Sequence, residues 1–570
     1  MRRFWRPREI AVFHDLAYRL PLTGVKVDTG FEPRRADFAV AFLTGRRVIP
    51  QQAINRPPVS SYEELALVHT EAYLESLSRP ETLAQIFSID PPEVRVDELL
   101  DTLRLACGGT AKGARLALER RIPVLNTLGG FHHAAPARGA GFCALNDIAV
   151  AIALVRQDGF SGQIAILDLD AHPPDGLAEC LKPDPRSWLG SLSGSDWGPL
   201  AKVDETVLPQ GCDDRTYLQA LDALLSRMPK PELAFVIAGG DVLAGDRLGL
   251  LGLTLAGARA RDLRVRKALR ETPSVWVPGG GYQADAWRVL AGTGAVLAGR
   301  SRMRIPQSYD PLRGYFEGIA RTMGAQFVRD QVLLDAEDLD ESLHQRPHQH
   351  PKLLGVYSEQ AIEYALSRFG LLSHLRRLGY EDLRIEVGEA NGADRFRLLG
   401  KSEGTEHLLM ETVLEKQTIG TGTFLFSNWF TLRHPRAQFS AHRPQLPGQD
   451  VPGLGLAREA GEVLAIIARQ LNLDGLAFRP SWYHMAYAGR YRFRFINSQR
   501  QGRFEAMLRD FKDIPLRDVT LALGEGRVLL NDQTYRWEPD DMAYWLTQPP
   551  DDSDAVAAER EQDHFRLAAS

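Results

Sequence analysis

Three aspartates and one histidine fall within the nine residues DLDAHPPDG, Asp168 to Gly176. If this segment is the end of a β-strand, alternate side chains share a face, so Asp168, Asp170 and His172 point the same way. Two carboxylates and an imidazole on one buried face are costly unless a cation or hydrogen bonds compensate them. The segment therefore predicts a site for a divalent metal ion.

Three further motifs carry polar side chains directly after apolar runs. These are FHHA, AGGD and PGGGY, which contribute His132 and His133, then Asp241, then Tyr282. An Asp, His, Asp set with an open coordination position is what a catalytic zinc ion requires. Two more histidines for proton transfer and a tyrosine hydroxyl would complete a hydrolytic site. Any one of these motifs is also typical of a simple turn, and it is their joint occurrence that favours the metal site.

The elements that would position these residues alternate along residues 1–310. Apolar runs predict buried strands at IAVFHD, IPVLNTLGG, QIAILDLD, LAFVIAGGD and SVWVPGGG, and amphipathic stretches between them predict helices. This alternation is typical of an α/β domain with a parallel sheet. Ligand sites of such sheets lie at the carboxyl ends of the strands, where the polar motifs fall.

The motifs FHHA, GFCALNDIAVA, ILDLDAHPPDG, AGGDVLAGDRLG and VPGGGY resemble, in order and spacing, those of the histone deacetylase family. That family also contains acetylpolyamine amidohydrolases and acetoin-utilization proteins. The resemblance covers about 300 residues. It implies an arginase/deacetylase-like α/β fold for residues 1–310 and the removal of an acetyl or other acyl group from an amine, with lysine as the expected substrate side chain.

The resemblance also implies a role for each motif residue. The zinc ligands would be Asp170, His172 and Asp241. His133, oriented by Asp175, would be the general base and would later protonate the leaving amine. His132, oriented by Asp168, would be its electrostatic partner, and Tyr282 would hydrogen-bond the oxyanion.

Further positions follow from the same resemblance. The Gly141 carbonyl would accept a hydrogen bond from the substrate amide, Phe142 would line the acyl-lysine tunnel, and Asp90 would contact the substrate backbone at the rim. Leu248 stands where polyamine-selective members carry a glutamate, which favours acyl-lysine over polyamines. A structural potassium ion would be bound by Asp168, Asp170, His172, Ser191 and Leu192.

The spacing favours one divalent metal over two. Binuclear manganese ureohydrolases of the same broad fold use DxHxD, whereas here Pro173 and Pro174 move the next carboxylate to Asp175, three residues after His172. Two residues after Asp241 there is Leu243 and no acid. The family usually has His-Gly where this chain has the two prolines. Because these two positions lie outside the proposed chemistry and the spacing to Asp175 is kept, we expect activity to survive with a stiffer loop.

The rest of the chain predicts a linker and a second domain. Residues 311–352 form a connecting segment whose charged part holds His344, His348 and His350, interpreted as solvated. Residues 353–548 have α+β character, and residues 549–570 are expected to be disordered. The loop with Gly453 and Gly455 before an amphipathic helix loosely resembles that of GNAT acetyltransferases, which implies acetyl-CoA binding. The same glycines are equally typical of an ordinary helix cap or packing turn.

Composition limits the remaining function classes. The chain has 570 residues, a net charge of -5 and four scattered cysteines. This predicts no direct nucleic-acid partner, no membrane span and a reducing, cytoplasmic location, while oligomerisation stays open. The leading hypothesis is a zinc-dependent deacetylase. The alternatives are an acetylpolyamine deacetylase and a non-catalytic protein that binds acyl-lysine or acyl-CoA.

Overall fold

The computed structural model describes residues 9–22, 29–91, 94–323, 351–439 and 444–568. The chain divides into two compact units, residues 1–315 and 316–570. Most of the predicted linker, including its three histidines His344, His348 and His350, lies outside the described residues.

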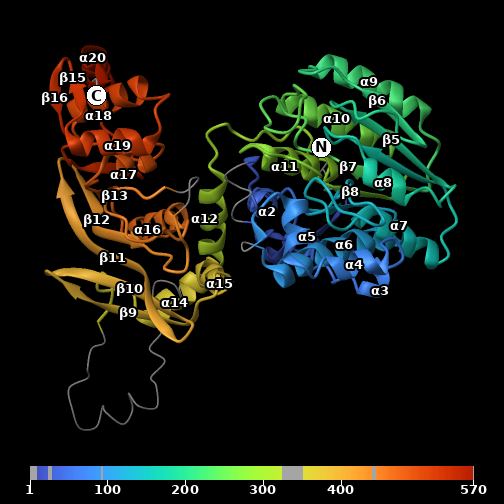
Figure 1. Cartoon of the computed structure of the whole chain (residues 1–570), viewed down its shortest axis with the longest axis horizontal. Helices are drawn as coiled ribbons and strands as arrows, with labels where there is room; N and C mark the ends of the chain where they lie inside the picture. The colour runs from blue at the N-terminus through green and yellow to red at the C-terminus, as the bar shows by residue number, and fades with distance from the viewer. Residues whose placement is uncertain (1–8, 23–28, 92–93, 324–350, 440–443, 569–570) are drawn as a thin grey trace, which may run out of the picture. The chain divides into compact units, whose positions relative to one another are not determined.

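The first unit is built on an eight-stranded sheet in which every neighbouring pair of strands is parallel (Figure 1). The strand order is β2-β1-β3-β8-β7-β4-β5-β6. The strands are β1 Ala11–Phe13, β2 Ile54–Asn55, β3 Pro123–Asn126, β4 Ile164–Asp168, β5 Ser187–Ser193, β6 Val203–Val207, β7 Leu233–Ile237 and β8 Ser274–Val277.

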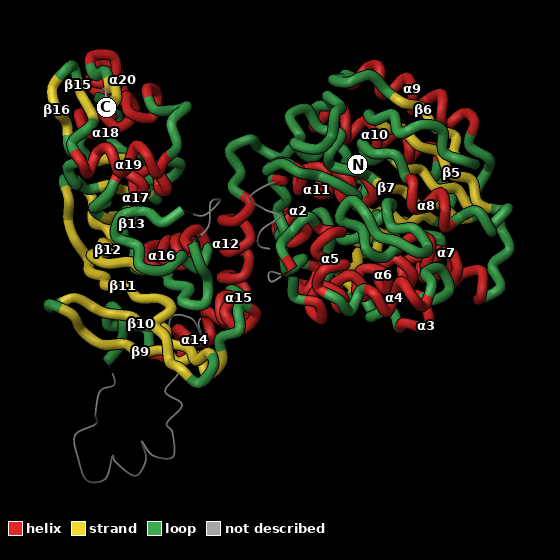
Figure 2. The backbone as a smooth tube through the Cα atoms, in the orientation of Figure 1, coloured by secondary structure: helices red, strands yellow, loops and turns green. Residues whose placement is uncertain are grey.

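Helices cover this sheet, as the colouring by secondary structure shows (Figure 2). Residues of the four central strands β3, β8, β7 and β4 are buried along their whole length, which explains their continuous apolar sequences. The helices are α2 Arg35–Gly45, α3 Tyr62–Leu65, α4 Glu71–Ser76, α5 Pro80–Phe87, α6 Val96–Arg120, α7 Asp147–Gln157, α8 Asp175–Cys180, α9 Asp214–Arg227, α10 Leu255–Ala268 and α11 Ala286–Leu297, with short 3₁₀ turns at Leu16–Tyr18 and Gln51–Ala53. A further helix, α12 Pro311–Met323, spans the boundary between the two units.

The second unit contains a seven-stranded mixed sheet in the order β14-β17-β13-β12-β11-β10-β9. Strands β9 to β12 form an antiparallel meander, and β12 is then joined through helix α16 to β13, its parallel neighbour. The elements are β9 Glu381–Ala390, β10 Ala393–Ser402, β11 Thr405–Ile419, β12 Gly422–Leu432, α16 Ala457–Gln470, β13 Gly475–Phe478, α17 Tyr483–Gly489, β14 Arg494–Phe495 and β17 Met542–Trp545.

The remaining elements of this unit surround a smaller core. A three-stranded sheet, β16-β15-β18, packs with helices around buried Phe504, Met507 and Phe565. Its elements are α18 Ser498–Asp510, α19 Leu516–Glu525, β15 Val528–Leu530, β16 Gln533–Tyr535, α20 Ser553–Gln562 and β18 Phe565–Leu567.

Two helices precede the seven-stranded sheet, α14 Glu359–Arg368 and α15 Leu371–Arg377, and they are separated at Gly370, which takes a left-handed conformation with φ 79°. One sequence prediction for this unit is wrong. The tail 549–570, predicted to be disordered, forms α20 and β18 through residue 567. Its polar composition hid a few well-buried side chains, chiefly Phe565 and Val556.

We therefore predict that Phe565→Ala destabilises the second unit by about 3 kcal/mol, the usual cost of emptying a buried aromatic site. The Phe565 ring packs against Tyr535 and Phe511, with ring centroids 5.4 Å and 6.0 Å away. Denaturant unfolding measures the change, with Arg566→Ala as the control because Arg566 makes only an exposed ion pair. Equal stability of the two variants would contradict the packed tail.

Candidate active site

The predicted polar motifs follow four strands that are neighbours in the sheet. In the order β3-β8-β7-β4, the chain continues from each strand into the segments that carry His132 and His133, then Tyr282, then Asp241, then Asp170 and His172. Parallel strands bring all four carboxyl ends to one edge. The central position of these strands therefore gathers residues that are up to 150 positions apart in the sequence.

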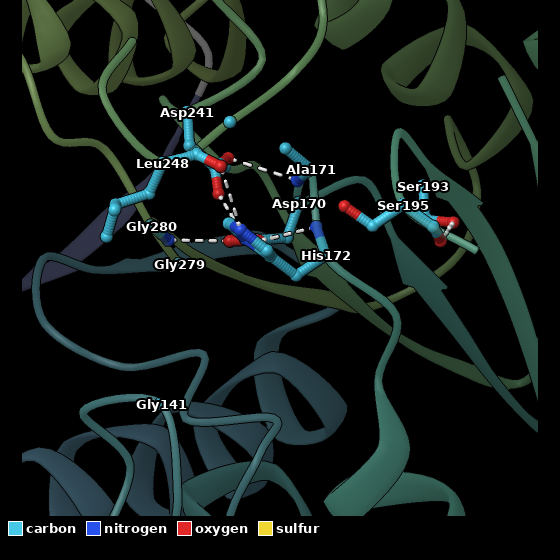
Figure 3. A network of polar contacts seen from close by, with 12 residues as sticks. Gly141, Asp170, Ala171, His172, Ser193, Ser195, Asp241, Leu248, Gly279 and Gly280 are labelled. Carbon is cyan, nitrogen blue, oxygen red and sulfur yellow. Dashed lines mark hydrogen bonds and ion pairs between the residues drawn. The ribbon is translucent and has the colours of Figure 1, made fainter. Parts of the chain in front are cut away.

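Asp170, His172 and Asp241 form the predicted metal-ligand cluster, with one ligand atom from each within 4.8 Å of the others. His172 Nδ1 lies 3.2 Å from Asp170 Oδ1 and 3.1 Å from Asp241 Oδ2, so the three side chains converge (Figure 3). On the other side of the ring, His172 Nε2 donates to the Leu248 carbonyl at 3.2 Å. This bond directs Nδ1 towards the carboxylates, as a second partner typically does for a metal-binding histidine.

The cluster concentrates negative charge away from water. Asp170 and Asp241 are almost fully buried, and burial together with the charge of Asp170 raises the pKa of Asp241 to about 7. Burial alone would lower the pKa of His172, but hydrogen bonds to the two carboxylates raise it to about 11. Such a donor set fits a divalent cation, which compensates buried carboxylates directly.

Next to the cluster are two buried histidine–aspartate pairs. His132 Nδ1 donates to Asp168 Oδ2 at 2.8 Å, and His133 Nδ1 donates to Asp175 Oδ1 at 2.7 Å. The Nε2 atoms of the two rings are 3.1 Å apart. The adjacent histidines thus converge because they lie in a glycine-flanked loop after β3 and not on a strand.

The two histidines differ in proton affinity. Burial opposes protonation of His132, but the charges of Asp168 and Asp170 outweigh burial and raise its pKa to about 9. Burial and the neighbouring charge of His132 lower the pKa of His133 to about 4. At neutral pH the His132 ring is cationic and the His133 ring is neutral, with the two Nε2 atoms facing each other, a division of roles that suits acid–base chemistry.

The PGGGY loop closes one side of the cluster. The Gly280 amide donates to Asp170 Oδ2 at 2.6 Å, and a Cβ on Gly279, whose φ is 55°, would lie 2.7 Å from the same oxygen. Only glycine permits that approach. Buried Arg35 holds the Gly279 and Gly280 carbonyls, and the Tyr282 amide is held by Asp246.

A cavity leads to this edge of the sheet, and its walls include Phe142, Tyr282 and both histidines. The Phe142 and Tyr282 rings lie 5.7 Å apart. Gly141 also lines the cavity, and Phe142 is held by a hydrogen bond from its amide to the Ile86 carbonyl. Asp90 is exposed and is not among the lining residues, and Leu248 contributes its carbonyl to His172.

Comparison with known proteins places this geometry in a family. A model of the histone deacetylase domain matches residues 29–294. Histone deacetylase 2 of Arabidopsis thaliana is 32% identical over 299 residues, which cover 50% of this chain and 77% of that protein. The chain belongs to the histone deacetylase family.

Other relatives have the same family name. Histone deacetylase 8 of Xenopus tropicalis is 28% identical over 309 residues, 47% of this chain and 79% of that protein. Among solved structures, an HDAC homolog from Aquifex aeolicus matches with a TM-score of 0.45 and 22% identity, covering 55% of this chain and 88% of that one. The family model and the Arabidopsis relative confirm the predicted family, and the parallel eight-stranded sheet confirms the α/β fold class of the first unit. The family match leaves residues 316–570 outside it.

Of the five residues named for a potassium ion, three lie on the neighbouring strands β4 and β5, and Asp170 and His172 follow the end of β4. Asp168 of β4 is paired in register with Ser191 of β5, and Leu192 follows. Ser191 Oγ is buried and has no hydrogen-bond partner in the described part of the chain. A buried hydroxyl in that state indicates room for another polar ligand or ion.

Sequence reasoning missed several residues that hold the site. Asp147 accepts hydrogen bonds from the Gly130 and Phe131 amides at 2.9 Å each and so fixes the loop that carries the two histidines. Asp147 lies inside the motif GFCALNDIAVA, which was the available signal. Trp197 stacks on His133 with centroids 5.2 Å apart, and no local pattern marked it.

His69 is a third missed residue. Its Nδ1 donates to the Ala135 carbonyl at 3.1 Å and its Nε2 accepts from the Asn146 amide at 3.0 Å. It therefore joins both ends of the segment that carries Gly141 and Phe142. Burial lowers its pKa to about 4, so the ring is neutral when the domain is folded at pH 7.

Within the described helices, none is both long and apolar enough to cross a membrane.

We predict that His69 makes stability depend on pH. The unfolded chain protonates this ring near pH 6.5 and the folded domain only near pH 4, so its contribution is complete above 6.5 and is lost as the pH falls to about 4. His69→Gln removes this titration, and the wild type should lose about 3 kcal/mol more than the variant between pH 7 and pH 4. Denaturant unfolding at several pH values tests this, and parallel pH curves for the two proteins would contradict it.

Proposed function

We propose that residues 1–315 form a zinc-dependent amidohydrolase that removes an acetyl or related acyl group from the lysine side chain of a protein or a small molecule. The carrying observation is the ligand cluster Asp170, His172 and Asp241 beside two buried histidines of opposite proton affinity. A hydrolase of an amide needs this combination of cation site, base and acid.

The metal would be held by Asp170 Oδ, His172 Nδ1 and Asp241 Oδ, whose buried carboxylates and directed imidazole fit zinc. A bound zinc ion supplies Lewis-acid polarisation of the substrate carbonyl. The next carboxylate in the segment, Asp175, is committed to His133, which supports one divalent ion.

The remaining chemistry belongs to side chains of the chain. His133 is neutral, and because its Nδ1–H is fixed on Asp175, its Nε2, which faces His132 Nε2 at 3.1 Å, is the atom that would accept a proton from water and return it to the leaving amine. His132 stays cationic and favours negative charge beside it. Burial and the charge of Asp170 raise the pKa of Tyr282, so its hydroxyl stays a donor for an oxyanion.

The cavity walls support a substrate with an alkyl chain. Phe142 and Tyr282 line the cavity and Trp197 stacks on His133, while Leu248, which is not among the lining residues, offers no charge for a cationic chain. The Gly141 carbonyl would accept from the substrate amide, and exposed Asp90 would contact the substrate backbone at the rim. Apolar walls of this kind suit the lysine methylenes.

A structural potassium ion is proposed beneath the site, with Asp168, Asp170, His172, Ser191 and Leu192 as ligands. The unpartnered, buried Ser191 hydroxyl beside the buried carboxylate of Asp168 supports it. Oxygen donors at this point suit a hard cation.

The test of this function is metal removal. Chelation followed by dialysis should abolish hydrolysis of an acetyl-lysine peptide, and one equivalent of Zn²⁺ per chain should restore it. Asp241→Asn should reduce both activity and zinc content, because one ligand charge is lost. Deacetylation that survives in protein shown to be metal-free would reject the proposal, and a protein that binds acyl-lysine without hydrolysing it would support the non-catalytic alternative.

A comparison of two hydrolysis rates tests the substrate class. We expect kcat/KM for an acetyl-lysine peptide to exceed that for acetylputrescine at least tenfold, since position 248 carries a leucine and not an acid that would attract a cationic chain. Leu248→Glu should narrow the difference by raising the acetylputrescine rate, and Leu250→Glu, also at an exposed leucine, is the control. A preference for acetylputrescine in the wild type would favour a polyamine deacetylase.

For the second unit we propose acyl-CoA binding. The parallel pair β12 and β13, joined by α16, supports this, together with Gly453 and Gly455 before the helix and the lack of a side-chain cap at its amino end. Such an end attracts phosphate groups. Calorimetric titration of the full chain with acetyl-CoA tests the proposal, and Gly455→Val, at φ 73°, should weaken binding at least tenfold. No heat of binding in the wild type would reject it.

A further inference from the structure

Arg261 of α10 is an arginine whose side chain is completely buried beneath the metal-ligand cluster. A guanidinium ion stays protonated even there, so its burial is tolerated only if acceptors surround it. The acceptors it uses are backbone carbonyls of the two segments that carry the carboxylate ligands.

A single nitrogen joins those two segments. Arg261 Nη1 donates to the Gly239 carbonyl at 2.7 Å and to the Leu169 carbonyl at 3.2 Å. Leu169 directly precedes Asp170, and Gly239 stands two residues before Asp241. The side chain therefore binds both ligand-bearing segments at once.

This bond lies where the sheet no longer holds the two chains together. The β4–β7 pairing ends at Asp168 and Ile237, and the Leu169 amide makes one more bond, to the Ile237 carbonyl at 3.0 Å. Beyond that point the guanidinium links the two backbones, and the Ala171 amide links one backbone to the Asp241 side chain. The guanidinium extends the pairing of the strands into the segments that hold the ligands.

The other edge of the guanidinium is anchored to helices. Arg261 Nε donates to Asp262 Oδ1 at 2.9 Å, and Asp262 Oδ2 accepts from Thr293 Oγ1 of α11 at 2.6 Å. Asp262 and Thr293 are also buried. The charge is thus neutralised, and the plane of the fork is fixed by two helices.

The two ligand segments leave little room for adjustment. A Cβ on Gly239 would lie 2.7 Å from the Asp170 Cα and 2.6 Å from Asp241 Oδ1. The Ala171 amide donates to the same Asp241 oxygen at 3.1 Å. A small shift of either segment would change the separation of the Asp170 and Asp241 carboxylates, whereas metal–ligand distances tolerate about 0.2 Å.

We propose that Arg261 is a positioning residue for the metal site, which sets the separation of Asp170 and Asp241 by holding the Leu169 and Gly239 carbonyls. This inference rests on the proposed metal-dependent function. Arg261 itself touches neither substrate nor metal, and it acts through the backbone of the two ligand segments.

The experiment compares Arg261→Lys with Arg288→Lys in the full chain. Arg288 is a matched control, because it is also buried in this unit, pairs with Asp285 and donates to the Pro306 and Gln307 carbonyls, which belong to no ligand segment. Lysine keeps the charge at either position but loses the two-edged fork. Thermal unfolding of the metal-free proteins records the general cost of each change.

The readouts are Zn²⁺ affinity, by competition with a chelator, and the visible absorption of bound Co²⁺, which reports ligand geometry. We expect Arg261→Lys to weaken Zn²⁺ binding roughly 10- to 100-fold, as loss of an outer-sphere partner does, and to alter the Co²⁺ spectrum. Arg288→Lys should match the wild type in both measurements, even if it unfolds at a lower temperature.

Two results would overturn the inference: an Arg261→Lys protein with wild-type affinity and spectrum, or equal weakening by both lysine variants. If Arg261→Lys does not fold, Asp262→Asn replaces it, because that change keeps both carbonyl bonds but loosens the anchor. It should shift the Co²⁺ spectrum in the same measurement, and an unchanged spectrum counts against Arg261. A wild type that binds neither metal would instead overturn the proposed function itself.

Discussion

The burial of three carboxylates at neighbouring strand ends is the constraint on which the rest of this domain depends. Asp168, Asp170 and Asp241 are almost fully removed from water, and ionised groups are not stable there without partners. Each feature around them supplies part of the compensation. His132 hydrogen-bonds to Asp168 and balances its charge, and His172 and backbone amides face Asp170 and Asp241. The oxygen and nitrogen atoms of the ligand cluster fit a cation, which supplies the rest of the compensation.

The same constraint accounts for the architecture of the loops. The carboxylates repel one another at short distance, so the loops that carry the site residues must be held in place. Other buried side chains, outside the ligand cluster, do this. Arg35 holds the glycine loop after β8, Asp147 holds the loop after β3, and Arg261 holds the segments after β4 and β7. None of these three side chains was recognised from the sequence as part of the site.

The sequence carries the local half of this organisation. Apolar runs that end in polar residues located the strands, and the order and spacing of the motifs identified the family and every member of the ligand cluster. What the sequence could not provide is the pairing order of the strands, since β8 lies between β3 and β7 through contacts about 40 to 150 positions apart. The residues that were missed belong to the same class: His69 and Trp197 act on partners far along the chain. The tail was misjudged because few buried residues sufficed to order it.

Trp197 covers one face of a buried histidine while staying largely exposed itself. Its indole stacks on His133, yet the residue is 53% exposed to solvent. A substrate chain lying on that face removes apolar surface from water, and in doing so it also shields the imidazole behind it. The dry environment that keeps His133 neutral is therefore strengthened by the substrate's own arrival, so that occupancy and readiness for proton transfer increase together.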